Sequence, residues 1–408
     1  MVKVSVIIPV YNVENYLKEC LDSVVNQTLS DIEIICINDG STDNSLAILE
    51  TYKNSDERVK VFSEDNSGQS VARNLGLKNS SGQYIYFIDS DDYIELNMLE
   101  ELYNNAVSNN SDIVVSKIAR FNNESSEIDY TKPGFDFDDK FGDVDYNHFT
   151  FNYKDIKPYV LNASFAPWMK LFRKDFLVNN NFYFDEHLVF EDVPFHVKTF
   201  LKADKISFAP DFYYYYRYNP SSTVNTASNG FDIFEIVDIV EDYLIDNYYY
   251  GEFKDEFDFF KSSQIINYIL TTQSEDYFIK AKEEFSKMKL SNNHMLPDYI
   301  YDKFNLVLNS DNYFDYIQHQ YDSRLTDMKS LHEENLLLHE RSVELELELN
   351  CISKSNKKLS KENKKLSKEN KKYKSKINKL EKTNKLLLNS TSWKVTAPLR
   401  KFTNIFRK

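Results

Sequence analysis

Residues 32–45, IEIICINDGSTDNS, pass directly from an apolar run into a polar loop that contains Gly40. The run at 32–37 is typical of a buried strand, and a glycine after it permits a tight turn. The same pattern recurs in three further apolar runs, at 4–10, 59–62 and 84–88. Three segments of helical character separate these runs, at 14–26, 44–54 and 70–79. Strands that alternate with helices predict an α/β fold, with a mostly parallel, Rossmann-like sheet flanked by helices.

The composition limits the class of protein. With 408 residues, 42% hydrophobic and 15% aromatic, the chain has enough apolar material for two or three structural units and is not a disordered polymer. Cys20, Cys36 and Cys351 are widely spaced and lack any CxxC or Cys/His pairing, which argues against disulfide frameworks and zinc sites. No apolar run reaches the roughly 18 residues that cross a bilayer, and the N-terminus does not resemble a signal peptide. We therefore expect a cytoplasmic protein.

Charge is divided unevenly along the chain. The net charge is −15, yet the residues from Cys351 onward carry 19 Lys and Arg against 3 Asp and Glu, a net of +16. The first 350 residues therefore carry −31. Such an acidic body disfavours nonspecific binding to nucleic acid, and we expect no nucleic-acid partner. The basic C-terminal part is compatible with anionic lipid or another anionic polymer.

Polar residues follow the predicted strands at the edge where ligands bind in sheets of this kind. Tyr11 follows the first strand, where its ring can stack on a nucleobase or simply pack. Asp39 follows the second strand and can accept hydrogen bonds from a base or ribose. Asp89, Asp91 and Asp92 follow the fourth, and neighbouring carboxylates repel each other unless a cation is present. Oxygen ligands suit Mg²⁺ or Mn²⁺, although an acidic surface turn is the simpler interpretation of these three residues alone.

Four motifs, VSVIIPVYN, NDGSTDNS, NSGQSVARNLG and FIDSDD, occur in this order within the first hundred residues. In order and spacing they resemble the nucleotide-binding half of the inverting family 2 glycosyltransferases, which have the GT-A fold. The resemblance continues more loosely through 168–176 (WMKLFRKDF) and 190–195 (FEDVPF) to about Val224. It implies transfer of a sugar from a nucleotide-sugar donor, with a UDP-sugar expected, to a hydroxyl of a cell-surface glycan or lipid-linked acceptor.

The resemblance also implies roles for individual residues. It implies that Tyr11 stacks on the donor base, that Asp39 binds the base, and that Arg73 lies near the diphosphate. In the family's DxD motif, Asp91 would be the ligand of Mn²⁺ or Mg²⁺, with Asp89 as a second ligand nearer the ribose. Three more residues complete the expected donor-binding set, Pro9, Glu14 and Asn66.

In FEDVPF, Asp192 matches the family's catalytic base. Inverting transfer is a single displacement, so the acceptor hydroxyl must lose its proton as it attacks, and a carboxylate within hydrogen-bond reach can take it. An ordinary solvated Glu-Asp pair at a helix start is the alternative for these two residues alone. Two other functions remain open: a non-catalytic scaffold that binds nucleotide-sugar, and a polyprenyl-phosphate sugar synthase.

The expected domain organisation follows from these motifs and from the C-terminal repeat. A GT-A domain at 1–225 comprises a nucleotide-binding half (1–100), a loop or insertion (119–157) and an acceptor half (158–225). A helical subdomain at 226–320, a coiled coil at 325–390 and a basic amphipathic tail at 391–408 complete the chain. We expect the tail to contact the inner face of the cell membrane peripherally, or to dock on the protein itself.

A seven-residue period is the evidence for the coiled coil. Its core positions d are Leu331, Leu338, Leu345, Ile352, Leu359, Leu366, Tyr373, Leu380 and Leu387. Core positions a include Leu349, Asn356, Asn363, Asn370, Ile377 and Asn384. Asn at a lowers stability but favours two parallel strands in register, so the pattern predicts a homodimer. A single charged helix is the alternative, because polar a positions weaken the core.

Overall fold

The computed structural model describes residues 1–121, 128–130, 140–142, 144–162, 166–217, 230–290 and 296–389. Residues 1–317 form one compact unit and residues 318–408 a second one. The expected tail at 391–408 lies outside the described residues, as does part of the expected loop at 119–157.

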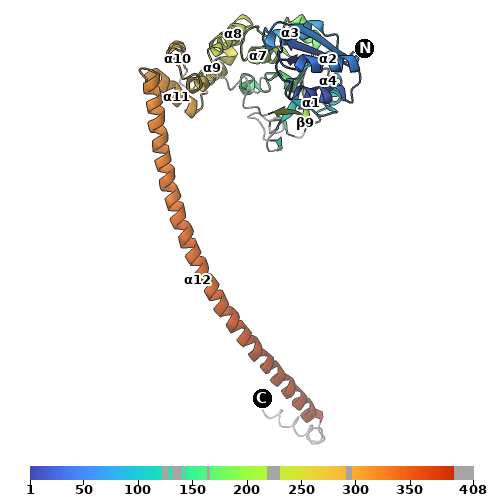
Figure 1. Cartoon of the computed structure of the whole chain (residues 1–408). Coiled ribbons are helices and arrows are strands. Elements are labelled where there is room, and N and C mark those ends of the chain that lie inside the picture. Colours follow the sequence, from blue (N-terminus) through green and yellow to red (C-terminus); the bar gives the residue numbers. More distant parts are fainter. Residues whose placement is uncertain are drawn as a thin grey trace. The chain divides into compact units, whose positions relative to one another are not determined.

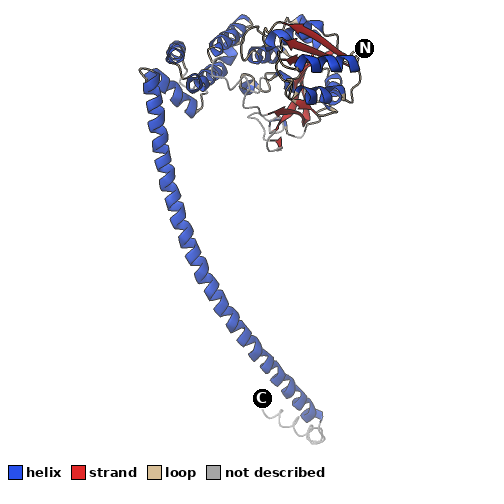
Figure 2. Cartoon of the chain, viewed as in Figure 1, coloured by secondary structure: helices blue, strands red, loops and turns tan. Residues whose placement is uncertain are grey.

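The first unit is built on a sheet of nine described strands, which Figure 2 shows in red. The strands are β1 (Val4–Val10), β2 (Ile32–Asp39), β3 (Val59–Glu64), β4 (Tyr84–Phe87), β5 (Tyr93–Ile94), β6 (Ile113–Phe121), β7 (Ile128–Asp129), β8 (Lys170–Arg173) and β9 (Ile206–Arg217). They lie in the order β3-β2-β1-β4-β8-β6-β9-β5, and β7 pairs with β6.

Helices cover this sheet and form most of the remainder of the described chain (Figure 1). Those of the sheet region are α1 (Leu17–Val25), α2 (Ser45–Ser55), α3 (Gln69–Asn79), α4 (Met98–Asn109), α6 (Lys174–Asn179) and α7 (Asp192–Lys202). Those that follow are α8 (Asp232–Asp246), α9 (Tyr250–Thr272), α10 (Glu275–Lys287), α11 (Asp298–Asn309) and α12 (Tyr313–Asn389). Two short 3₁₀ helices lie at Lys157–Tyr159 and Pro167–Met169.

The N-terminal half has the parallel arrangement that the sequence predicts. β1 pairs in parallel with β2 and β4, and β2 pairs in parallel with β3. Every residue of β1 and β2 is buried, as expected for strands with both faces covered. The second half of the sheet is mixed, because β8 runs antiparallel between β4 and β6. The architecture is that of a GT-A fold.

The predicted helical subdomain is present as α8 to α11. The apolar face predicted at its start is buried, at Ile233, Ile236, Val237, Val240 and Leu244. The long C-terminal helix begins at Tyr313, earlier than the expected boundary at 325, because its first turns pack on the subdomain. The ring centroid of Phe278 in α10 lies 5.6 Å from that of Tyr316, which is fully buried.

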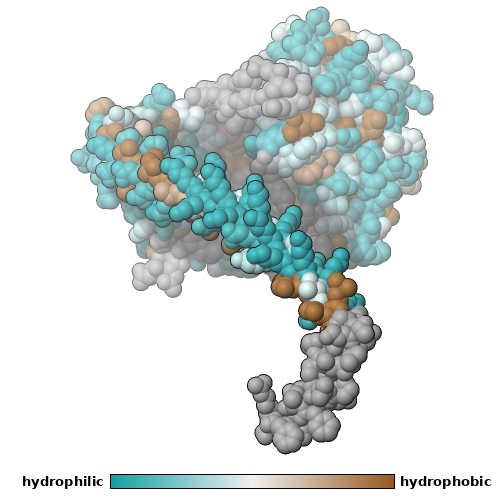
Figure 3. Space-filling model, turned by 90° about the horizontal axis from the view of Figure 1, so that it is seen from below, coloured by the Kyte–Doolittle hydropathy of each residue, from teal (hydrophilic) through white to brown (hydrophobic). Residues whose placement is uncertain are grey.

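Most of α12 beyond its first turns is open to solvent. All residues from 331 to 388 are exposed. In Figure 3 this helix is mostly hydrophilic, with hydrophobic residues near the end of its described part. No described helix is long and apolar enough to span a membrane.

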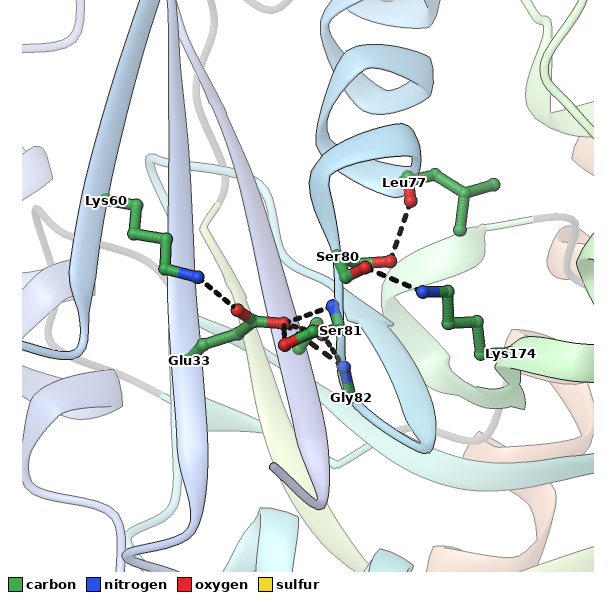
Figure 4. A network of polar contacts seen from close by, with 8 residues as sticks. Glu33, Lys60, Leu77, Ser80, Ser81, Gly82 and Lys174 are labelled. Carbon is green, nitrogen blue, oxygen red and sulfur yellow. Dashed lines mark hydrogen bonds and ion pairs between the residues drawn. The ribbon is translucent and has the colours of Figure 1, made fainter. Parts of the chain in front are cut away.

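One buried carboxylate ties the N-terminal strands together (Figure 4). Glu33 of β2 is 3% exposed and accepts hydrogen bonds from the Ser5 hydroxyl at 2.5 Å and the Lys60 ammonium at 2.7 Å. It also accepts the backbone N–H groups of Ser81 at 2.5 Å and Gly82 at 3.1 Å. Burial opposes ionisation, but these donors outweigh it and lower the pKa of Glu33 to about 2.

We predict that Glu33→Gln lowers the free energy of unfolding by about 1–3 kcal/mol at pH 7, because an amide NH₂ then faces buried donors. Because the folded-state pKa is depressed, the contribution of Glu33 is complete above its unfolded value of 4.5 and is lost as pH falls toward 2. Urea denaturation from pH 7 to pH 3 measures this difference.

The matched control is Asp31→Asn, which removes an exposed ion pair with Lys3 and should change stability by less than about 1 kcal/mol. A difference between wild type and Glu33→Gln that stays constant down to pH 3 would contradict the role given to this carboxylate.

Candidate active site

The acidic turn after β4 contains carboxylates in different environments. Asp89 and Asp91 are half-buried, whereas Asp92 is 1% exposed. Asp92 accepts hydrogen bonds from the Tyr214 hydroxyl and, at 2.7 Å, from the backbone N–H of Arg217. Asp92 therefore fastens the turn to β9, a structural role that its place in the motif did not reveal.

Arg217 holds the same turn through its side chain. It is 2% exposed, and its Nε donates to the backbone oxygen of Asp91 at 2.6 Å. Its Nη2 pairs with Glu19 of α1 at 2.6 Å. The turn is thus fixed to both β9 and α1.

Arg73 of α3 joins this turn to a distant part of the chain. Its Nη2 lies 2.8 Å from Oδ1 of Asp89, and its Nη1 lies 2.5 Å from Oε1 of Glu191. The guanidinium is 3% exposed and lies 5.2 Å from the ring centroid of Phe184. Its buried Nε has no hydrogen-bond partner among the described residues. Arg73 therefore brings the acidic turn and the Glu191-Asp192 pair into one cluster.

Burial and charge act against each other in this cluster. Burial lowers the pKa of Arg73, but the carboxylates of Asp89 and Glu191 outweigh it and raise that pKa. Burial raises the pKa of Glu191 and that of Asp192, and the charge of Arg73 opposes both shifts. A carboxylate whose pKa is raised toward neutral is a better proton acceptor near pH 7.

Asp192 begins α7 and is half-buried beside a second cation. Lys170 of β8 is 1% exposed, and its Nζ donates to the backbone oxygen of Ala166 at 2.9 Å. Burial lowers the pKa of Lys170 to about 7, and the charge of Asp192 opposes this shift. The positive charge of Lys170 in turn opposes the rise that burial causes in the pKa of Asp192.

The loop that carries Glu191 is held by α3. Asn74 donates from Nδ2 to the backbone oxygen of Phe184 at 2.9 Å, and its Oδ1 accepts the N–H of Phe184 at 2.9 Å. The Ser70 hydroxyl accepts the N–H of His187 at 3.3 Å. Sequence reasoning missed these anchors, although both residues belong to the NSGQSVARNLG motif.

The expected donor-binding residues lie around the ends of β1 and β2. Tyr11 directly follows β1 and is 49% exposed, whereas Pro9 is buried in β1 opposite Ile37. The carboxylate of Glu14 accepts the Asn44 backbone N–H at 2.9 Å and its side-chain amide at 2.6 Å. Of Tyr11, Pro9 and Glu14, only Tyr11 has an exposed side chain that makes no hydrogen bond to a described residue.

Asp39 organises the loop before α3. It is 4% exposed, and its two oxygens accept the N–H groups of Ser67 at 2.7 Å and Gly68 at 3.0 Å. Gly40 has φ +69°, and a Cβ there would lie 2.7 Å from the backbone N of Asn66. The absence of a side chain at Gly40 therefore lets the loop approach β2. Asn66 itself is exposed.

The carboxylates of the acidic turn after β4 suit a hard divalent cation. Asp89 and Asp91 supply carboxylate oxygens, and Oδ1 of Asp89 also accepts from Gln69 at 3.0 Å. No cluster of three or more His, Cys, Asp or Glu that could hold a metal ion occurs in the described part of the chain. Mg²⁺ is commonly bound by one or two carboxylates together with substrate phosphates, so these two residues fit such an ion in the presence of a diphosphate.

Comparison with known proteins assigns the family. The model of Glycosyl transferase family 2 matches residues 5–178. GlyG, a glycosyltransferase of Streptococcus pneumoniae serotype 4, is 31% identical over 250 residues, which are 58% of this chain and 77% of GlyG. This chain belongs to glycosyltransferase family 2. The four N-terminal motifs of this family 2 chain all lie within or at the edge of the matched region.

Two further relatives of this family 2 chain are covered to very different extents. Poly(ribitol-phosphate) beta-glucosyltransferase of Bacillus spizizenii is 38% identical over 222 residues, 52% of this chain and 32% of that protein. The solved structure of S. aureus TarS 1-349 with UDP-GlcNAc is 25% identical, with a TM-score of 0.46, and the match covers 69% of this chain and 84% of the TarS 1-349 chain. The chain spans 31% and 62% of the lengths of two other curated relatives.

We predict that Arg73→Met lowers the free energy of unfolding by about 3–5 kcal/mol, because the buried Glu191 and the half-buried Asp89 lose their shared partner. The double variant Arg73→Met/Glu191→Gln should be more stable than Arg73→Met, since it removes one of the uncompensated charges. Urea denaturation at pH 7 gives both values.

As a control, Lys3→Met removes a cation whose partner Asp31 is largely exposed, and it should cost under about 1 kcal/mol. An Arg73→Met protein as stable as this control would show that the double ion pair does not hold the cluster together.

Proposed function

We propose that this chain is an inverting glycosyltransferase that transfers a sugar from a nucleotide-sugar, expected to be a UDP-sugar, to a hydroxyl of a cell-surface glycan or lipid-linked acceptor. The observation that carries this proposal is the position of Arg73, which links the acidic turn to the pair Glu191-Asp192. Family membership supports sugar transfer. The name of the Bacillus spizizenii relative, poly(ribitol-phosphate) beta-glucosyltransferase, supports a cell-surface polymer as acceptor.

The proposed reaction uses two sides of the cluster. On the donor side, Tyr11 stacks on the base, Asp39 and its loop bind the nucleoside, and Arg73 lies near the diphosphate. Asp91 and Asp89 would hold Mn²⁺ or Mg²⁺, whose charge offsets that of the leaving diphosphate when the ion is bound.

On the acceptor side, Asp192 removes the proton from the attacking hydroxyl. The oxygen attacks the anomeric carbon from the face opposite the diphosphate, so a single displacement inverts the configuration. Lys170 lies behind the base, and its charge favours ionised Asp192 before the proton is taken.

We also propose that α12 pairs with a second copy of this chain in a parallel coiled coil. From Leu331 to Leu387 the repeat covers about 85 Å of helix. A strict seven-residue repeat drifts about 20° per heptad around a straight helix, so only a partner that supercoils with it stays in contact throughout.

The core residues favour the parallel arrangement. Asn356, Asn363 and Asn370 occupy a positions between d-position leucines. In a parallel, in-register pair each Asn faces the same Asn, and the two amides satisfy each other. In an antiparallel pair, a positions face d positions, so each amide would be buried against leucine. A second copy is therefore the best-matched partner. The tail at 391–408 would then be present twice at one end, which supports the proposed contact with anionic lipid.

We predict that Asp192→Asn lowers transfer and donor hydrolysis at least 100-fold, because an amide cannot accept the proton. Binding of UDP should stay within about threefold of wild type. Turnover is measured as UDP release from UDP-glucose, UDP-galactose, UDP-N-acetylglucosamine and UDP-N-acetylgalactosamine with 5 mM Mn²⁺, taken as roughly saturating, and binding is measured by thermal stabilisation.

Asp175→Asn is the matched control, because Asp175 also lies in the first turn of a helix, α6, and is exposed. It should retain wild-type turnover. UDP binding without turnover in the wild type would instead favour the non-catalytic scaffold.

For the coiled coil, we predict disulfide cross-linking at an a position. In a Cys351→Ser background, which leaves only the buried Cys20 and Cys36, Asn363→Cys should form a dimer of about 96 kDa, twice 48.1 kDa, on oxidation. Lys361→Cys, at the outward f position, should remain mostly monomeric on a non-reducing gel. Equal cross-linking of the two variants, or a monomer mass by light scattering, would refute the pairing.

A further inference from the structure

Two aromatic rings meet beside the proposed base. Phe190 precedes Asp192 by two residues, and its ring centroid lies 5.1 Å from that of Tyr268, with the ring planes at 48°. Both side chains are half-buried, so each presents part of its surface to solvent. Tyr268 belongs to α9, and thus the helical subdomain reaches the cluster that contains Asp192.

The backbone at Phe190 is held in an unfavourable conformation. Its φ is +71°, a region that bulky residues rarely adopt and that costs about 1–3 kcal/mol. Two contacts keep it there: the Val193 N–H donates to the Phe190 carbonyl at 3.1 Å, and the Val189 N–H donates to Asp232 of α8 at 3.0 Å. Strain of this kind persists where it positions a functional group, and here it positions the Phe190 ring against α9.

Tyr268 also offers a polar group. Its hydroxyl makes no hydrogen bond to a described residue. Burial and then the charge of Asp192 raise the pKa of Tyr268, which is consistent with a hydroxyl that stays protonated near the base. It can therefore donate a hydrogen bond to a ligand that lies between the rings and Asp192.

We propose that Phe190 and Tyr268 form an acceptor subsite that holds a neutral sugar ring, with one of its hydroxyls directed at Asp192. This inference rests on the proposed glycosyltransferase function and names its acceptor class. The apolar face of a pyranose suits an aromatic surface, and its hydroxyls suit the Tyr268 O–H.

The charges around this subsite favour a neutral ligand over an anionic one. Asp192 lies at the start of α7, and Asp232, at the start of α8, accepts the N–H of Val189, the residue before Phe190. The two nearby cations are not open to an anionic ligand: Arg73 binds Asp89 and Glu191, and Lys170 is 1% exposed and donates to the backbone oxygen of Ala166. A phosphate placed on the rings would therefore meet carboxylates. Both ring residues lie outside 5–178, the part matched by the family model; Phe190 is the first residue of FEDVPF, whereas Tyr268 belongs to none of the motifs that resemble the family.

The test compares Tyr268→Ala and Tyr268→Phe with wild type in the full chain. Two reactions are followed for each protein: hydrolysis of the UDP-sugar that gives the highest wild-type turnover, and transfer to added acceptors. The acceptors are methyl β-glucopyranoside, methyl β-galactopyranoside, methyl N-acetyl-β-glucosaminide and ribitol 5-phosphate. Tyr299→Ala on α11, a tyrosine that is 61% exposed, is the matched control.

We expect Tyr268→Ala to lower kcat/KM for the ring acceptors at least tenfold, mainly through KM, with donor hydrolysis within twofold of wild type. Tyr268→Phe should keep most of the transfer, because the ring surface remains, and Tyr299→Ala should match wild type. Unchanged donor hydrolysis also shows that the variant is folded.

Three results would overturn the inference while leaving the proposed function standing. These are equal transfer to ring acceptors by Tyr268→Ala and wild type, wild-type transfer to ribitol 5-phosphate alone, and wild-type donor hydrolysis with transfer to none of the ring acceptors. Absence of both hydrolysis and transfer with every UDP-sugar would instead refute the proposed function, and the subsite with it.

Discussion

The double ion pair of Arg73 is the interaction on which the rest of the site depends. One guanidinium, almost fully buried, binds Asp89 after β4 and Glu191 before α7. These carboxylates are about a hundred positions apart in the chain, and the sheet alone does not bring them together. A planar fork with several donors is suited to holding two carboxylates at once, which a lysine in the same place would do less well. The donor half and the acceptor half of the proposed reaction therefore meet at one side chain of α3.

The other polar contacts keep the two halves rigid around that side chain. Asp92 and Arg217 fasten the acidic turn to β9 and α1, and Asn74 fastens the loop before Glu191 to α3. The carboxylates that remain half-buried, Asp89, Asp91 and Asp192, are those to which chemistry is assigned. Asp92 and Arg217, which serve structure, are buried and hydrogen-bonded, whereas these three carboxylates keep some exposed surface. Rigid support of this kind is what holds reacting groups in place.

The sequence predicted the N-terminal half of the fold well, because its signals are local. β1 and β2 are apolar runs that end in polar loops, and the structure places them where the pattern does. The antiparallel direction of β8 was not predicted, because nothing in the sequence of residues 170–173 indicates which strands they pair with. In the site, motif spacing identified Asp89, Asp91 and Asp192 as candidates. It did not reveal that Asp92 is structural, nor that the ring of Tyr268 packs on Phe190, because both facts depend on contacts between elements distant in the chain.

The close approach at Gly40 links two loops that the sequence presents as separate motifs. Any side chain at this position would collide with the backbone of Asn66 and displace residues 66–68. Ser67 and Gly68 would then withdraw their N–H groups from Asp39, leaving a carboxylate inside the protein without donors. A substitution at Gly40 would in this way disrupt the hydrogen bonds that residues 67 and 68 donate to the Asp39 carboxylate. A side chain at position 40 would therefore require a compensating change in the backbone of residues 66–68.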